Sequence, residues 1–250
     1  MMIKISAVSY LNTIPFIHGL KQSELIHIID LKLDYPSICA DKLINGEVDL
    51  ALVPVAIIPK LKEAHIISDY CIGSDGAVDT VCLYSDVPIT EVDSIALDYQ
   101  SRTSVALLKI LLKEYWKLNP VLKKADIGFE ENIKDKNAAL VIGDRAFNLN
   151  SKHKYIYDLS AIWKEMTALP FVFAAWVTNK KLPQDFIIDF NKALKNGLSD
   201  IDATLNFKGN NYPSCEKPKD YLNNQISYFL DAEKQKGMEL FLRKVTNQIV

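Results

Sequence analysis

Three short polar segments each follow a run of apolar residues that is typical of a β-strand. Their sequences are SYLN at 9–12, SRTS at 101–104 and GDR at 143–145. In an open α/β sheet, the loops at the carboxyl ends of the strands converge on one crevice, and ligands bind in that crevice. Hydroxyl, amide and charged groups in three such loops therefore predict a site for a small polar ligand.

The SRTS segment carries the strongest of these signals, because it lies between an expected strand and a strongly amphipathic helix. Free backbone N–H groups and the positive end of the helix dipole suit this position to a carboxylate or a phosphate. Ser101 and Thr103 would add hydroxyl donors, and Arg102 would add a positive charge. A plain Ser/Thr cap of the helix is the alternative interpretation. The segment is no P-loop, since the glycines and the lysine of that motif are missing.

The other two segments also allow simpler structural interpretations. Asn12 and Thr13 could form a turn and a helix cap. As a ligand-binding residue, Asn12 would orient a substrate, because its neutral amide is a poor base. Asp144 and Arg145 could form a surface ion pair of little energetic value. Thr80 lies inside an expected strand and would contribute only if its side chain faced the cleft.

The composition is that of an ordinary globular protein and argues against several classes of function. The 250 residues are 49% hydrophobic and 24% charged, with a formal net charge of −2. Such a chain offers no broad basic surface, so we expect neither nucleic acid nor a membrane as a partner. The four cysteines are scattered without a CxxC or Cys/His cluster, which predicts no metal site. GxGxxG, HExxH and nucleophile-elbow motifs are also missing, so no cofactor and no covalent catalysis are expected.

The first residues, MMIKISAV, do not read as a signal peptide, because Asn12 and Pro15 soon interrupt the apolar stretch. No apolar run approaches the roughly 20 residues of a membrane-spanning helix. Together with scattered cysteines, these features predict a soluble, cytoplasmic protein.

The periodicity of the apolar residues predicts a β-α-β-α-β unit followed by a second α/β unit, a pattern typical of parallel sheets. The approximate expected strands are 3–8, 27–33, 49–53, 66–68, 78–84, 95–98, 138–142 and 171–177. The approximate expected helices are 36–45, 104–117, 158–168, 184–198, 219–233 and 234–246.

The last expected strand follows a complete second unit, which suggests that the chain there returns to the first lobe. We therefore expect an α/β protein with two lobes and a ligand cleft between them. One lobe would consist of residues 1–85 and 178–250, and the other of residues 86–177. Strand-like linkers are expected near 85–88 and 174–178.

Six blocks of the sequence resemble those of chorismate dehydratases, the first enzymes of the futalosine route to menaquinone. They occur in the same order between about residues 3 and 180. The blocks are SAVSYLNTIPF, DLALVPVAI, GAVDTVCLYS, ALDYQSRTSVALLKILL, ALVIGDRA and DLSAIWKEMTALPFVFAAWV. The C-terminal helices carry no recognisable motif.

The resemblance implies a periplasmic-binding-protein-like type II fold and a carbon–oxygen lyase, a hydro-lyase that needs no metal or cofactor. Its substrate would be the small dicarboxylate chorismate, and its product 3-[(1-carboxyvinyl)oxy]benzoate. Asn12 corresponds to the family's cleft asparagine and is the expected catalytic residue. The residues that the resemblance assigns to substrate binding are Ser9, Tyr10, Thr80, Ser101, Arg102, Thr103, Gly143 and Asp144.

The chain departs from the family at one place near the site. Many members have Arg-Ser-Val where this chain has Asp79, Thr80 and Val81. Thr80 keeps the hydroxyl, but Asp79 replaces a cation, which puts one carboxylate contact in question.

The implied reaction makes modest demands on the protein. Loss of the C4 hydroxyl and the C3 proton makes the ring aromatic, so positioning and exclusion of water could provide much of the rate. A substrate carboxylate could take the proton while Asn12 fixes the geometry.

Two other functions stay open from the sequence. A non-catalytic anion-binding or sensor protein could use the same fold, since a fold does not determine function. The sister enzyme of the same pathway, which forms dihydroxynaphthoate, has a His-rich first block after the initial Ser-Tyr. This chain has Leu11 and Asn12 there.

Overall fold

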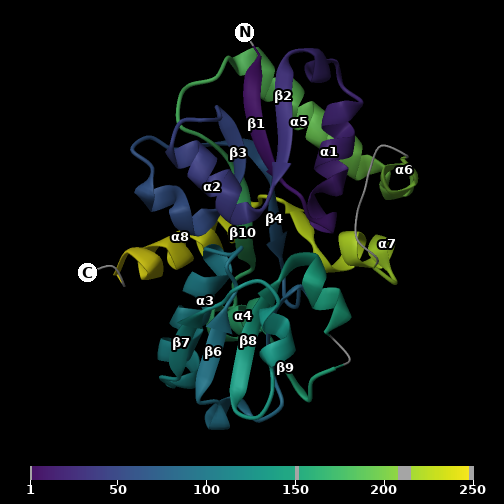
Figure 1. Ribbon diagram of the computed structural model, residues 1–250. Helices are drawn as coiled ribbons and strands as arrows, with labels where there is room; N and C mark the ends of the chain where they lie inside the picture. The colour runs from purple at the N-terminus through teal and green to yellow at the C-terminus, as the bar shows by residue number, and fades with distance from the viewer. Residues whose placement is uncertain (1, 150–151, 208–214, 248–250) are drawn as a thin grey trace.

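Two β-sheets with their flanking helices build two lobes in the computed structural model, which describes residues 2–149, 152–207 and 215–247. Figure 1 shows the lobes one above the other, with the beginning of the chain in the upper one. We call the lobe around the six-stranded sheet the first lobe and the lobe around the five-stranded sheet the second lobe.

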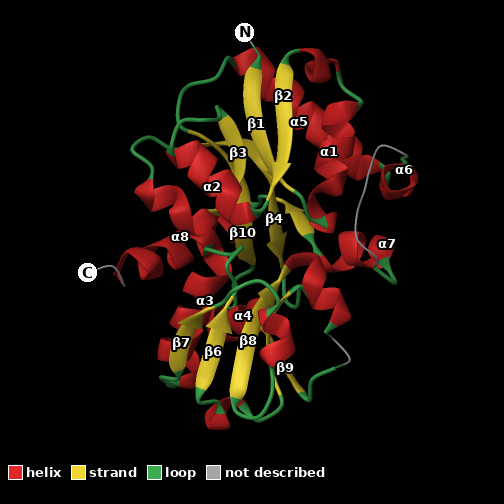
Figure 2. Ribbon diagram, viewed as in Figure 1, coloured by secondary structure: helices red, strands yellow, loops and turns green. Residues whose placement is uncertain are grey.

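The sheet of the first lobe consists, in spatial order, of β11 (Ser227–Phe229), β4 (His65–Ser74), β10 (Phe171–Thr178), β3 (Leu50–Pro54), β1 (Ile3–Val8) and β2 (Ile29–Asp34). Strand β1 pairs in parallel with β2 and β3, whereas β10 is antiparallel to both β3 and β4. The helices on this side of the molecule are α1 (Ile14–Lys21), α2 (Pro36–Ile44), α5 (Gln184–Ser199), α6 (Ile201–Asn206), α7 (Pro218–Asp220) and α8 (Ala232–Asn247). Figure 2 shows α1 and α5 on one side of the sheet and α2 on the other.

The sheet of the second lobe consists, in spatial order, of β7 (Val121–Lys124), β6 (Ser94–Leu97), β8 (Asn137–Ile142), β5 (Val81–Ser85) and β9 (Tyr155–Asp158). Its helices are α3 (Thr103–Leu111) and α4 (Leu159–Thr167). Short 3-10 helices connect the strands of both lobes: η1 (Leu11–Thr13), η2 (Glu24–His27), η3 (Val55–Lys60), η4 (Ile89–Glu91), η6 (Phe129–Asn132) and η7 (Gly143–Asn148). Two π-helical turns are η5 (Leu112–Trp116) and η8 (Tyr221–Gln225).

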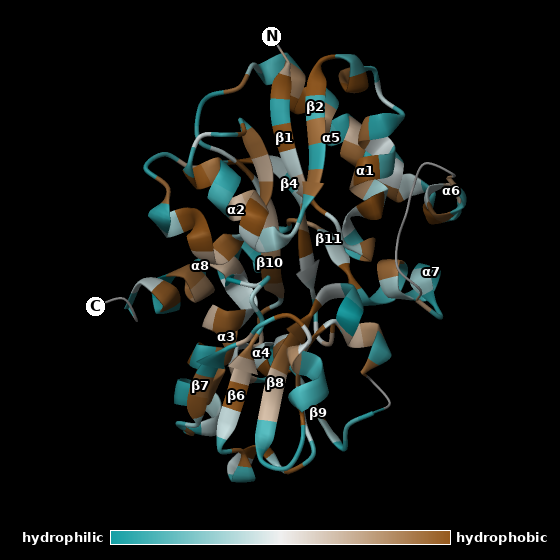
Figure 3. Cartoon of the chain, viewed as in Figure 1, coloured by the Kyte–Doolittle hydropathy of each residue, from teal (hydrophilic) through white to brown (hydrophobic). Residues whose placement is uncertain are grey.

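The central strands β3 and β10 are buried at every position, which explains their uninterrupted apolar sequences LALVP and FVFAAWVT. Strands covered by helices on both faces need apolar side chains on both, so they lack the alternation of half-exposed strands. Figure 3 shows the hydrophobic residues concentrated in such strands between the helices.

Helices α1 and α5 pack backbone to backbone through two glycines. A Cβ on Gly19 would lie 2.0 Å from the carbonyl oxygen of Ala193, and one on Gly197 would lie 1.8 Å from that of Pro15. No side chain fits at either position. The contact fixes the beginning of α1, and with it the loop that connects β1 to this helix.

The structure confirms the predicted α/β class with two separate sheets, but it assigns two strands differently from the predicted lobe boundaries. Residues 81–85 form β5, which pairs with β8 and β9 of the second lobe. Residues 171–178 form β10, which pairs with β3 and β4 of the first lobe. The ranges 1–85 and 86–177 therefore each contain a strand of the other sheet. An apolar run shows that a strand is buried but does not show which sheet it joins.

Several individual elements also differ from the prediction. The expected helix 219–233 is divided into α7, η8 and strand β11. The expected helix 104–117 is α-helical only to Leu111 and continues as the π-helical turn η5. Strands β7 and β9 were not predicted, because the lysines of VLKK and the aspartate of YIYD dilute the apolar pattern of four-residue strands.

Candidate functional site

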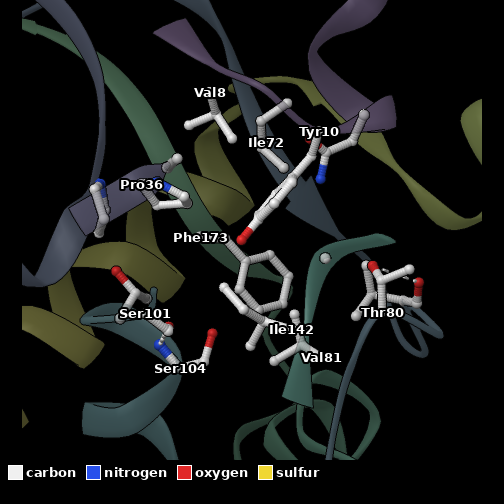
Figure 4. Close-up of a pocket in the computed structure, with 16 residues that line it drawn as sticks. Val8, Tyr10, Pro36, Ile72, Thr80, Val81, Ser101, Ser104, Ile142 and Phe173 are labelled. Carbon is white, nitrogen blue, oxygen red and sulfur yellow. Dashed lines mark hydrogen bonds between the residues drawn. The ribbon is translucent and has the colours of Figure 1, made fainter. Parts of the chain in front are cut away.

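A cavity between the two lobes brings together most of the predicted site residues. The empty space in it amounts to about 540 Å³, its open mouth included. Figure 4 shows Tyr10 extending into this space, with Ser101 and Ser104 on one side and Thr80 on the other. The polar lining residues are Tyr10, Asn12, Thr80, Ser101, Thr103 and Ser104. Apolar side chains, among them Ile72 and Phe173, form much of the remaining wall.

The SYLN segment supplies the wall from the first lobe. Tyr10 is 8% exposed, and its hydroxyl donates a hydrogen bond to Oε1 of Gln100 in the second lobe. Burial, and secondarily the nearby carboxylate of Asp98, raises the pKa of Tyr10 well above its ordinary value, so this phenol stays protonated and can donate. Ser9 differs from its neighbours, because it is exposed and does not line the cavity.

Asn12 lines the cavity and is held at two points. Its Oδ1 accepts a hydrogen bond of 3.2 Å from the hydroxyl of Thr13. Its backbone carbonyl accepts a hydrogen bond of 2.9 Å from the hydroxyl of Tyr228. The predicted turn-and-cap interpretation is incomplete, since Thr13 makes no side-chain cap of α1.

The SRTS segment supplies the opposite wall at the beginning of α3. Ser101 Oγ accepts a hydrogen bond of 3.0 Å from the backbone N–H of Ser104, so the capping interpretation is correct for this residue. Ser101 also lines the cavity, and capping and ligand binding are therefore compatible. Thr103 Oγ1 accepts a hydrogen bond of 3.2 Å from the N–H of Ala56 in the first lobe.

Arg102 does not line the cavity. Its guanidinium forms an ion pair of 2.5 Å with Asp41 on α2, and both side chains are partly exposed. This pair joins the second lobe to the first.

The GDR segment places its three residues in three different environments. Gly143 lines the cavity, and its N–H donates a hydrogen bond of 2.9 Å to the carbonyl of Thr80. Both carboxylate oxygens of Asp144 accept the N–H of Leu11 at 3.1 Å, across the lobes. Burial nevertheless raises the pKa of Asp144 to about 6, since this one N–H compensates only part of the lost hydration. Arg145 does not pair with Asp144, contrary to the surface-pair alternative.

Arg145 instead stabilises the interior of the second lobe. It forms ion pairs of 2.5 Å with Asp98 and with Glu130. Its guanidinium also lies over the rings of Tyr99 and Phe129. The side chain is therefore occupied away from the cavity.

Thr80 faces the cavity, and the neighbouring Asp79 does not. Thr80 is 1% exposed, and its Oγ1 lies 2.8 Å from the hydroxyl of Tyr221. Asp79 is exposed and has a φ of +63°, and its N–H donates to the carboxylate of Asp158 at 2.8 Å. The replacement of a cation by Asp79 therefore does not add a carboxylate to the cavity wall.

The electrostatics of the cavity come from helix ends and hydroxyls. No lysine or arginine in the described parts of the chain lines it. Helices α2 and α3 both begin at its wall, at Pro36 and Thr103, and direct the positive ends of their dipoles toward it. An anion is the ligand that this arrangement favours.

Sequence reasoning missed Tyr221 and Tyr228, which reach Thr80 and Asn12 from the end of the chain. Neither tyrosine follows a parallel strand, so the rule that identified the three loops could not find them. Pro36, which lines the cavity at the beginning of α2, could have been found from the sequence, since proline favours the first turn of a helix.

Two kinds of feature are absent from the described residues. They contain no group of three or more His, Cys, Asp or Glu side chains arranged to hold a metal ion. None of their helices combines the length and the apolar character that a membrane span requires.

Comparisons of the sequence with known proteins point to one family. A family model described as menaquinone biosynthesis matches residues 3–247. A chorismate dehydratase from Thermus thermophilus is 29% identical over 194 residues, which cover 70% of this chain and 69% of that protein.

Comparisons of the structure show a periplasmic-binding-protein-like fold. Protein AF1704 from Archaeoglobus fulgidus superposes with a TM-score of 0.74 at 15% identity, covering 99% of this chain and 97% of its own. The aliphatic sulphonate binding protein SsuA from Escherichia coli has a TM-score of 0.55 at 13% identity, covering 100% and 93% of the two chains. The predicted fold is thereby confirmed.

Proposed function

Because the chain belongs to the menaquinone biosynthesis family, we propose that it is a chorismate dehydratase, which converts chorismate to 3-[(1-carboxyvinyl)oxy]benzoate and water. One structural observation carries the proposal. The amide of Asn12 in the first lobe and the hydroxyls at the beginning of α3 in the second lobe line the same cavity. Such a cavity suits a small molecule that has carboxylates at its ends and reacts in its middle.

The hydroxyls at the beginning of α3 would bind one carboxylate of chorismate. Ser101 Oγ and Thr103 Oγ1 each accept a backbone N–H, so their own protons stay available for donation. A hydrogen bond from such a hydroxyl to a carboxylate is charge-assisted and stronger than one between neutral groups. Tyr10, Thr80 and Gly143 complete the proposed contacts, since they too line the cavity.

The dehydration breaks two bonds of the substrate ring. The C3–H bond gives its proton to a base, and the C4–O bond breaks as the hydroxyl takes up a proton and leaves as water. The base can return the proton that it removed, so the step neither gains nor loses a proton overall. We assign the base to a substrate carboxylate and the orientation of the ring to the amide of Asn12. The apolar wall, including Ile72 and Phe173, would exclude bulk water and hold the reacting groups in place.

Three proposed binding residues lie outside the cavity lining. Arg102 and Asp144 each bond to the first lobe, through Asp41 and Leu11, so we assign them the role of holding the lobes closed around the substrate. Ser9 is exposed in the SYLN segment, and we propose that it contacts the substrate at the mouth of the site. The four cysteines carry no disulfide, and this supports the cytoplasm as the place of the reaction.

Incubation of the purified protein with chorismate tests the proposal. We expect chorismate to disappear and the benzoate product to form, followed by NMR and by its aromatic absorbance. Saturable binding of chorismate without product would instead indicate a binding or sensor protein. The absence of both binding and product would contradict the proposal and favour the dihydroxynaphthoate-forming enzyme. The same preparation could be assayed for that activity.

A further inference from the structure

The last part of the chain approaches the cavity through two tyrosines. After α7 the chain forms the turn η8 and strand β11, which pairs with β4 at the edge of the first lobe's sheet. Tyr221 begins η8, and Tyr228 is the middle residue of β11. Their hydroxyls reach residues of the cavity wall that precede them by 141 and 216 positions.

Tyr221 is anchored by its ring and bonded by its hydroxyl. It is 4% exposed, and its ring meets that of Phe147 edge-on at 5.0 Å. The hydroxyl lies 2.8 Å from Oγ1 of Thr80. This bond connects the last part of the chain to a residue of the cavity wall.

Tyr228 holds the backbone of Asn12. Its ring packs edge-on against Phe16 of α1 at 5.3 Å, and its hydroxyl donates to the carbonyl of Asn12 at 2.9 Å. The backbone of Asn12 is therefore bonded to a tyrosine of this segment.

Thr80 is also hydrogen-bonded to the GDR segment. Its carbonyl accepts the N–H of Gly143 at 2.9 Å, and Gly143 is part of the cavity wall. The position of Tyr221 thus affects both Thr80 and the loop that follows β8.

We propose that Tyr221 and Tyr228 are positioning residues, which fix Asn12 and Thr80 in the orientation that the substrate requires. The inference rests on the proposed dehydratase function. Neither tyrosine lines the cavity, so their effect on the reaction passes through the residues they hold. An asparagine that only orients its substrate depends fully on its own orientation, because a misplaced amide provides no charge to compensate.

Removal of the Tyr221 hydroxyl provides the test. Tyr221→Phe keeps the ring packing, and we expect kcat to fall about 10-fold, equivalent to about 1.4 kcal/mol, with KM changed less than threefold. Tyr228→Phe should act in the same direction. Tyr157→Phe is the matched control, since its hydroxyl accepts the N–H of Ile89 at 2.8 Å in the second lobe, away from the cavity. It should leave kcat unchanged.

A double-mutant cycle separates positioning from a general loss of structure. In the Thr80→Val background, Tyr221→Phe should lower kcat by less than twofold, because the group it positions is gone. Thr80→Val breaks the same hydrogen bond from the other side and should reproduce most of the Tyr221→Phe defect. Circular dichroism and thermal unfolding verify that each variant is folded.

The outcomes distinguish the inference from the function on which it rests. A wild-type protein that does not convert chorismate overturns both. An active wild type with an equally active Tyr221→Phe variant overturns the positioning role alone. A 10-fold loss that persists undiminished in the Thr80→Val background also overturns it, since the tyrosine would then act independently of Thr80.

Discussion

The ring of Tyr10 lies directly against Gly143, and a Cβ on Gly143 would come within 2.6 Å of the ring atoms Cε2 and Cζ. This contact joins the loop after β1 in the first lobe to the loop after β8 in the second. Gly143 has a φ of +66°, in the region that favours glycine. Position 143 therefore tolerates no side chain, for both conformational and packing reasons.

Gly143→Ala is expected to reduce both substrate affinity and stability. The new methyl group would force apart the two loops that close over the cavity, so we expect KM to rise by about 10-fold or more and the free energy of unfolding to fall by about 1–3 kcal/mol. Steady-state kinetics and urea unfolding measure the two effects. Gly128→Ala is the matched control, because Gly128 has a φ of +82° but no atom near its Cβ position. Equal kinetic defects in both variants would show that crowding of Tyr10 is irrelevant.

Asn12→Ala and Asn12→Asp test whether position 12 orients the substrate or removes its proton. Loss of an orienting hydrogen bond should lower kcat by about 10- to 100-fold, from a cost of roughly 1–3 kcal/mol. Asn12→Asp should be worse than Asn12→Ala, because a carboxylate there faces a dianionic substrate at short range. Its defect should deepen from about pH 5 to 8, because burial and the dianionic substrate would raise the pKa of the new carboxyl above its ordinary value. Wild-type activity in Asn12→Asp, or a gain with rising pH, would identify position 12 as a base.

Ser101→Ala separates capping from substrate binding. The variant loses the cap of α3, at about 1 kcal/mol of stability, and also the proposed bond to a carboxylate, at roughly 1.5–3 kcal/mol. We therefore expect kcat/KM to fall by about 10- to 150-fold, and Thr103→Ala to show a similar defect. Asp200→Ala is the control, since Asp200 caps α6 by accepting the N–H of Ala203 at 2.8 Å. It should lose stability without losing activity. Unchanged kinetics in both Ser101→Ala and Thr103→Ala would reduce the segment to a cap.

Asp144→Asn should change the pH dependence of stability. Burial raises the pKa of Asp144 from 3.8 to about 6, so the folded protein binds this proton more tightly than the unfolded chain does. The cost of ionising Asp144 is therefore absent below about pH 4 and complete above about pH 6. The variant lacks this cost, and its free energy of unfolding relative to wild type should improve by about 1–3 kcal/mol between pH 4 and 7.

Urea unfolding at several pH values measures this difference. Asp189→Asn, at an exposed position of α5, serves as the control and should follow wild type throughout. A difference between Asp144→Asn and wild type that stays constant with pH would contradict the assigned cause.

The sequence was sufficient to predict the fold class and most of the polar residues of the cavity wall. Polar residues after apolar strands identified Tyr10, Asn12, Ser101, Thr103 and Gly143, because the carboxyl ends of parallel strands meet at one edge. These predictions depend on local patterns, which a single sequence displays directly.

The remaining features depend on contacts between distant parts of the chain. The partner of Arg102 is Asp41, 61 positions away, and no local pattern distinguishes this pair from a contact with substrate. The same holds for Tyr221 and Thr80, 141 positions apart. The sequence correctly indicated that the chain returns to the first lobe at β10, but the predicted boundaries left β10 in the second lobe and β5 in the first. They failed for the same reason, since hydrophobicity does not specify a strand's neighbours.

The position of β10 between β3 and β4 has a consequence for the order in which the chain folds. Before residues 171–178 are synthesised, β4 has no strand to pair with in its own sheet, whose other neighbour β11 comes later still. All five strands of the second lobe are present once synthesis reaches Asp158. During translation the second lobe is therefore complete first. The sheet of the first lobe, which contains β1, is completed only after β10 and β11 have been synthesised.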